Sequence, residues 1–101
     1  MKVTRVQYTV RPEYVEQNKR NIEVVMRELR AIGNDDVKYA VYLLQDGRTF
    51  MHFVHQNTAE AERYPTSLES FKAFQTQLSA NLEVPPKVEP LTLLDASAPT
   101  F

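Results

Sequence analysis

The stretch VKYAVYLLQDGRTFMHFVH, residues 37–55, decides the predicted fold. Two runs of strand-forming residues, 37–44 and 49–55, flank the pair Asp46-Gly47, which favours a hairpin with a two-residue type I′ turn. Counting outwards from such a turn places Val41 opposite His52. One face of the hairpin then carries Tyr39, Val41, Leu43, Phe50, His52 and Val54. The other face carries Ala40, Tyr42, Leu44, Met51, Phe53 and His55.

Both faces of this hairpin are apolar, as in strands that meet water on neither side. Two helices can cover one face of a four-stranded sheet, and the other face would then expose a patch of more than roughly a few hundred Å². A second copy packed sheet to sheet is the expected cover, because twofold self-association is the commonest form of assembly. The alternative is that the C-terminal tail or the Pro85-Pro86 segment folds over this face. We therefore predict a homodimer.

The residues before the hairpin predict a strand followed by a long helix. Residues 3–10 alternate between apolar and polar side chains, with Tyr8 on the apolar face. The helix begins at Pro12, because proline suits the first helical position, and it ends at Gly33. Its apolar stripe has the helical period and consists of Val15, Ile22, Val25, Met26, Leu29 and Ile32.

The residues after the hairpin predict a short helical turn over residues 59–62 and a second helix that Ser67 caps. The apolar stripe of this helix consists of Leu68, Phe71, Phe74, Gln75, Leu78 and Leu82. Pro85-Pro86 then leads to a last strand over residues 88–94.

This order of elements predicts an α+β, ferredoxin-like β-α-β-β-α-β fold. Four antiparallel strands form the sheet, and the two main helices lie on one of its faces. We expect one domain over residues 1–95 and a C-terminal tail over residues 96–101.

The composition excludes several classes of function. The formal net charge of the 101 residues is −1 and no block of Lys or Arg stands out, so neither nucleic acid nor a membrane surface is an expected partner. The chain has no cysteine, which excludes disulfides and thiolate nucleophiles and favours a reducing compartment. No apolar stretch is as long as the apolar region of a signal peptide or a membrane span. We expect a cytoplasmic protein.

Four short segments carry a family resemblance. They are Val10-Arg11-Pro12-Glu13, His55-Gln56-Asn57-Thr58-Ala59-Glu60-Ala61, Ser70-Phe71-Lys72-Ala73-Phe74 and Pro85-Pro86-Lys87-Val88. Over residues 2–94 the chain resembles the antibiotic-biosynthesis-monooxygenase-like group of dimeric α/β barrels. The resemblance implies cofactor-independent oxygenation of a small aromatic or quinol-like substrate in a pocket between sheet and helices.

The chain departs from this family at several functional positions. An ungapped match places Gln56 at the family's usual tryptophan and Pro65 at its usual histidine. In the haem-degrading branch a histidine of the last helix binds iron, and Gln75 matches it here. The asparagine in the first strand of that branch falls near Val6. The resemblance therefore implies neither haem nor any other cofactor.

His52 is the principal candidate for a catalytic residue. A histidine within an apolar strand face costs free energy unless it has a partner, and it ionises near neutral pH, so it is a candidate proton acceptor. Tyr8 and Tyr39 are candidates to orient a phenolic substrate. The alternative for all three is a hydrogen-bonded role in the core or the dimer interface. His52 and His55 point to opposite faces and cannot bind one metal ion, so no metal site is expected.

Two hypotheses of function remain open at this stage, and the sequence does not decide whether the chain is an enzyme. The first is an oxygenase of the resembled kind, with His52 and either Tyr8 or Tyr39 as its polar groups. The second is a non-catalytic dimeric barrel that binds a small apolar ligand or serves as an assembly module. The departures at Gln56 and Pro65 favour the second hypothesis, and the resemblance favours the first.

Overall fold

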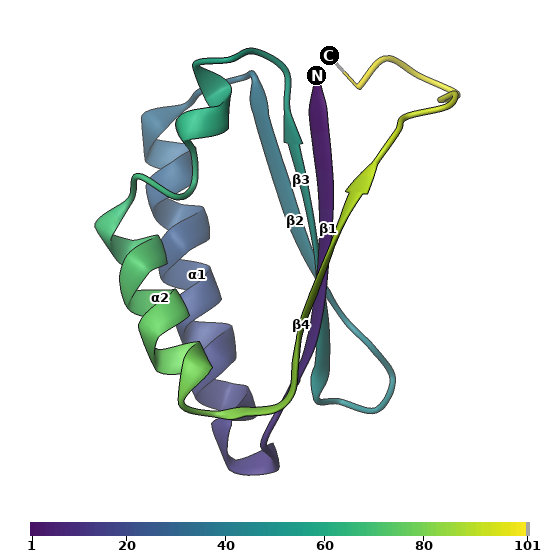
Figure 1. The fold of residues 1–101 in the computed structure, drawn as a ribbon. Coiled ribbons are helices and arrows are strands. Elements are labelled where there is room, and N and C mark those ends of the chain that lie inside the picture. Colours follow the sequence, from purple (N-terminus) through teal and green to yellow (C-terminus); the bar gives the residue numbers. More distant parts are fainter. Residues whose placement is uncertain (101) are drawn as a thin grey trace.

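The computed structural model describes residues 1–100 and shows a sheet covered on one side by two helices (Figure 1). The strands are β1 (Lys2–Val10), β2 (Val37–Leu43), β3 (Thr49–Gln56) and β4 (Leu82–Leu91). The helices are α1 (Val15–Ile32) and α2 (Glu69–Ser79), preceded by the short 3-10 turns η1 (Pro12–Tyr14) and η2 (Ala61–Arg63). Every neighbouring pair in the order β2-β3-β1-β4 is antiparallel. The predicted β-α-β-β-α-β fold is confirmed, while Phe101 of the predicted tail lies outside the described residues.

The helices cover the sheet face that carries Tyr8 and His52 (Figure 1). No helix covers the opposite face, called the bare face below, and the C-terminal segment reaches only one end of it, where Lys38 donates to the Thr100 carbonyl. Their apolar stripes meet this face and form the core with it, because only one stripe of an amphipathic helix can be buried. Gln75, which the periodicity places in the stripe of α2, is instead exposed. The buried core consists of Tyr8, Val10, Tyr14, Val25, Phe50, Leu68, Phe71, Phe74 and Leu78.

The hairpin has the predicted register and a different turn. Val41 lies opposite His52 and Leu43 lies opposite Phe50, as counted from the sequence. The turn is not type I′, because that turn needs positive φ at both central residues and only Gly47 has it, with φ 73°. Residues 45–48 form a four-residue loop instead, in which the Asp46 carboxylate accepts the backbone N–H groups of Arg48 and Thr49 at 2.9 Å. The register is unchanged because the predicted two-residue loop and the observed four-residue loop are both centred between Asp46 and Gly47.

Of the three predicted helix boundaries, only the one at Gly33 is confirmed. Pro12 begins the 3-10 turn η1, and the α-helix itself begins at Val15. Gly33 ends α1 in the left-handed conformation, with φ 67° and its N–H donating to the Leu29 carbonyl at 3.1 Å. The predicted cap of α2 by Ser67 is wrong, since Leu68 is the N-cap residue. The backbone N–H of Ser67 donates to the Arg63 carbonyl at 3.0 Å, which places Ser67 in the preceding turn.

The last strand begins earlier than predicted. β4 starts at Leu82 and contains Pro85 and Pro86, which the sequence placed before the strand. Proline has no N–H to donate and is tolerated in edge strands and at bulges. β4 is an edge strand, and its pairing with β1 shifts register between Gln7 and Thr9. Both conditions are therefore met here.

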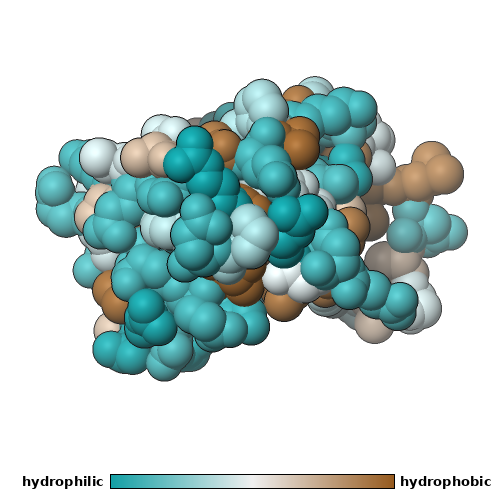
Figure 2. Space-filling view, turned by 90° about the horizontal axis from the view of Figure 1, so that it is seen from below, coloured by the Kyte–Doolittle hydropathy of each residue, from teal (hydrophilic) through white to brown (hydrophobic). Residues whose placement is uncertain are grey.

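The bare face of the sheet is partly apolar. Tyr42 is 58% exposed on this face, Val84 and Leu91 are also exposed, and Met51 and Phe53 are half-buried. Figure 2 views the molecule from the lower end of Figure 1, where hydrophilic side chains cover most of the surface and hydrophobic ones form small patches. This end therefore offers no comparable apolar surface. Neither helix of residues 1–100 has the combination of length and apolar character that crossing a bilayer requires.

Candidate functional site

The three residues that the sequence singled out lie together in one hydrogen-bonded chain. His52 on β3 lies beside Tyr8 of β1 on one side and Tyr39 of β2 on the other, because β3 is the central neighbour of both strands. The Tyr8 hydroxyl is 2.7 Å from Nε2 of His52. The Tyr39 hydroxyl is 2.6 Å from Nδ1 of the same ring. Both imidazole nitrogens are thus engaged by tyrosine hydroxyls.

Burial controls the ionisation of this chain. His52 is only 3% exposed, and its ring packs at 5.8 Å from that of Phe74. Burial lowers the pKa of His52 to about 4, so the imidazole is neutral at neutral pH. Burial also raises the pKa of Tyr8 and of Tyr39, although a hydrogen bond from Asn18 opposes the rise at Tyr8. All three groups are therefore uncharged near pH 7.

The lowered pKa of His52 predicts a loss of stability in mild acid. The folded-state pKa of about 4 lies below the ordinary value of 6.5, so unfolding takes up a proton between these pH values. The stabilisation is present above about pH 6.5 and falls by about 3 kcal/mol as the pH drops to about 4. Urea denaturation at several pH values, at one protein concentration, measures this loss. His52→Gln is the control, and a wild-type profile parallel to that of this variant would contradict the prediction.

Asn18 of α1 is a fourth member of the chain that the sequence analysis missed. Its Nδ2 donates to the Tyr8 hydroxyl at 3.0 Å, and the side chain is fully buried. Its Oδ1 is buried and has no hydrogen-bond partner among residues 1–100. The signal was present in the sequence, because Asn18 lies three residues after Val15 and four before Ile22. It is a polar residue within the apolar stripe of α1.

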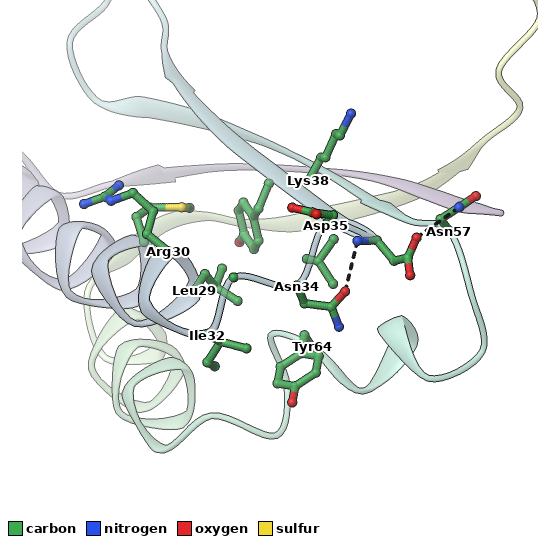
Figure 3. A pocket seen from close by; sticks show the side chains of 13 residues that line it. Leu29, Arg30, Ile32, Asn34, Asp35, Lys38, Asn57 and Tyr64 are labelled. Atoms are coloured by element: carbon green, nitrogen blue, oxygen red, sulfur yellow. Dashed lines mark hydrogen bonds between the residues drawn. The ribbon is translucent and has the colours of Figure 1, made fainter. Parts of the chain in front are cut away.

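A cleft of about 790 Å³ opens between the C-terminal end of α1, the start of β2 and the segment around Tyr64. Its apolar walls are formed by Met26, Leu29, Ile32, Val37, Tyr39 and Tyr64, and its polar rim by Arg30, Asn34, Asp35, Asp36, Lys38 and Asn57. In Figure 3, Leu29 and Ile32 lie on the helix side of the cleft and Tyr64 lies on the side of the η2 segment. The backbone N–H of Asp36 donates to Oδ1 of Asn34 at 2.9 Å, which orders the loop between α1 and β2.

Tyr39 is the site residue that connects the cleft with the buried chain. It lines the cleft and also a space beside His52, Phe71 and Phe74 that is too narrow to hold a water molecule. Met26 lines both spaces as well and separates them together with Tyr39. A ligand in the cleft would therefore contact the Tyr39 side chain, whereas His52 lies behind it. This geometry changes the sequence hypothesis, because His52 would act on a ligand through Tyr39 and not directly.

His55, the other histidine, lies outside the hydrogen-bonded chain of Tyr8, His52 and Tyr39. His55 pairs with Val3 and Lys38 on the bare face of the sheet, as the alternation of the strand requires. Within residues 1–100, no three His, Asp or Glu side chains come together as a group that could hold a metal ion. The hydrogen-bonded chain of the candidate site therefore consists of Asn18, Tyr8, His52 and Tyr39, and does not include His55.

Solved structures of other proteins share this fold, although no protein-family model and no curated protein matches the sequence. Rv0793 from Mycobacterium tuberculosis has a TM-score of 0.78 at 17% identity and covers 96% of this chain and 98% of its own. An antibiotic biosynthesis monooxygenase has a TM-score of 0.77 at 13% identity, with 94% and 100% covered. A variant of SnoaB, a cofactor-independent oxygenase from Streptomyces nogalater, has a TM-score of 0.70 at 13% identity, with 95% and 96% covered.

The TM-scores of 0.70 to 0.78 establish a shared fold over nearly the whole chain, and at 13–17% identity the likeness extends to the fold alone. The structural neighbours include antibiotic biosynthesis monooxygenases, as the resemblance of the sequence predicted. A fold hosts many functions, so the activity has to be argued from the Tyr8–His52–Tyr39 chain and the cleft.

Proposed function

We propose that this protein is a cofactor-independent oxygenase that acts on a small aromatic or quinol-like substrate in the cleft between the helices and the sheet. The observation that carries the proposal is the chain of neutral hydrogen-bonding groups that ends at Tyr39, on the wall of the cleft. The fold shared with a cofactor-independent oxygenase supports it by analogy.

The reaction requires the protein mainly to position the substrate and to stabilise the negative charge of the substrate anion. A phenol or anthrone that has lost a proton to solvent water in the cleft is electron-rich and transfers electrons to dioxygen without a metal or flavin. For an anthrone-like CH₂ group, one oxygen atom enters the carbon and the other leaves as water, and the substrate supplies all the electrons. A donor aimed at the substrate oxygen stabilises the anion, as oxyanion donors do in other enzymes. Tyr39 would be that donor, and His52 with Tyr8 would hold it in place.

Oxygen uptake with a panel of hydroquinones and anthrone-like phenols tests this function. We expect uptake above the no-protein rate with wild type and a loss of about a hundredfold in kcat/KM for Tyr39→Phe, the size found when one oxyanion donor is removed. His52→Gln should lower it too, because Tyr39 loses its partner. Tyr42→Phe makes the same chemical change on the same strand but on the bare face, so it should retain activity.

Uptake equal to the no-protein rate would contradict the oxygenase and favour the second hypothesis, a barrel that binds an apolar ligand without chemistry. Two observations favour that alternative. The space beside His52 is too narrow to hold a water molecule, and the family's tryptophan position holds Gln56, whose amide donates to the Tyr64 carbonyl. Ligand binding to the wild-type cleft without any oxygen consumption would be its signature.

We also propose that the chain works as a homodimer through the bare face of the sheet. Tyr42, Val84 and Leu91 are exposed there, which gives a partner an apolar surface to cover. On this face Arg5 lies 2.6 Å from the Glu89 carboxylate and Lys87 lies 3.8 Å from it, so covering these residues would bury charges that already have a partner of opposite sign. A second copy is the simplest partner, since a twofold axis matches the same surface with itself.

A further inference from the structure

The hydrogen bonds of the buried chain have one consistent direction, which begins at Asn18. Four groups lie in series: the Asn18 amide, the Tyr8 hydroxyl, the His52 ring and the Tyr39 hydroxyl, at distances of 3.0, 2.7 and 2.6 Å. Each hydroxyl has one proton, and a neutral imidazole has one N–H and one acceptor nitrogen. Because a buried hydroxyl proton also needs an acceptor, fixing the direction of the first hydrogen bond fixes all the others.

The orientation of the Asn18 amide follows from its complete burial. With Nδ2 towards Tyr8, the group left without a partner is a carbonyl oxygen. With the amide reversed, an NH₂ group and both its protons would occupy that position. Buried N–H groups without an acceptor are rarer in proteins than carbonyls without a donor. Asn18 thus donates to Tyr8.

The proton of each following group is then determined. The Tyr8 oxygen receives the Asn18 N–H, so the Tyr8 proton goes to Nε2 of His52. The neutral imidazole consequently has its proton on Nδ1 and donates it to the Tyr39 oxygen. The Tyr39 proton then has no acceptor within these four groups. Because the Tyr39 side chain lines the cleft, we take its acceptor to be a group bound there. With the Asn18 Nδ2 towards Tyr8, the reverse direction in His52 would leave the buried Tyr8 hydroxyl proton without an acceptor.

We infer that Asn18 is a positioning residue that makes Tyr39 a hydrogen-bond donor to the cleft, so that the ligand presents an acceptor oxygen there. The ligand class is an aromatic with a phenolate, enolate or carbonyl oxygen, and a neutral phenol is bound less well through its O–H. This inference rests on the proposed cleft site and specifies the chemistry of its ligand. It also gives His52 the role of holding the Tyr39 hydroxyl.

The tautomer of His52 is the direct test. In ¹⁵N-labelled, ligand-free protein at neutral pH, long-range ¹H–¹⁵N NMR spectra distinguish a proton on Nδ1 from one on Nε2, and we expect Nδ1–H. Asn18→Asp places a carboxylate there, which accepts hydrogen bonds and cannot donate, so once ionised it should reverse the chain and give Nε2–H. Asn21→Asp is the matched control, because Asn21 donates to Tyr14 at 3.2 Å outside the chain. Nε2–H in wild type, or an ionised Asn18→Asp variant that keeps Nδ1–H, would overturn the inference.

A second measurement remains decisive if Asn18→Asp fails to fold. 4-Nitrophenol changes colour when it ionises, so its titration can be followed while it is bound. A donor at Tyr39 stabilises the phenolate, and the bound dye should ionise about one pH unit lower in wild type than in Tyr39→Phe, a difference of about 1.4 kcal/mol. Ionisation at an equal or higher pH in wild type would overturn the inference. Dye that does not bind at all contradicts the phenol site of the proposed function, whereas the tautomer result separately decides the direction of the chain.

Discussion

Tyr42→Asp should convert the protein from a dimer of about twice the 11.7 kDa chain mass into a monomer. Tyr42 lies on the bare face of the sheet and packs edge-on against Phe53, with ring centroids 5.8 Å apart. A second sheet over this face would bury the introduced carboxylate twice, once from each copy. Burying an unpaired charge costs several kcal/mol, which opposes the association. Light scattering at micromolar concentration measures the mass.

Val24→Asp is the matched control for this change. Val24 is an apolar residue of similar exposure, 47%, but it lies on α1 and away from the bare face of the sheet. This variant should remain dimeric. A monomeric wild type, or a Tyr42→Asp variant that keeps the dimer mass, would contradict the proposed interface. A second copy would then not be what covers this face.

Phe74→Ala should reduce the free energy of unfolding by about 3–5 kcal/mol, the usual cost of removing a buried aromatic ring. Phe74 of α2 is 5% exposed and packs against the rings of Phe71 and His52 at 5.6 and 5.8 Å. These neighbours belong to the sheet and the helix and cannot close the cavity without moving the whole layer. Urea denaturation at fixed protein concentration measures the loss, since unfolding of a dimer depends on concentration.

The same variant has a second readout at the site. Removing the Phe74 ring admits solvent beside His52, so the pKa of His52 should rise from about 4 towards its ordinary value. Phe74→Leu fills most of the space and should cost about 1–2 kcal/mol with a smaller rise. A loss of stability below 1 kcal/mol for Phe74→Ala would mean that α2 is not anchored to the sheet through this ring.

Local patterns in the sequence were enough for the order of the elements and for the hairpin register. The alternation in residues 37–55 places Val41 opposite His52 whatever the turn type, because any even-numbered loop with the same centre gives this pairing. The turn type itself was wrong, since the Asp46 carboxylate stabilises a longer loop through Arg48 and Thr49. The start of β4 was also wrong, because an edge position tolerates Pro85 and Pro86 and no sequence pattern marks an edge.

The candidate site, like the fold, could be predicted from the sequence only in part. His52, Tyr8 and Tyr39 could be selected from the sequence because each is a polar group within an apolar strand face, and a buried polar group needs a partner. That these partners are one another was decided by the strand order β2-β3-β1, which brings residues 8, 39 and 52 side by side. Asn18 was missed because its partner is across the core, although it interrupts the stripe of α1.

The sequence by itself determined the order of the helices and strands, the strand pairing of the hairpin and the apolar character of both of its faces, since each depends on periodicity over a few residues. Only the tertiary structure decided which face the helices cover, that Tyr39 and not His52 lines the cleft, and that Asn18 orients the buried chain. These facts depend on contacts between segments from ten to more than forty residues apart. Such contacts arise from the packing of helices on the sheet, and no local pattern encodes them.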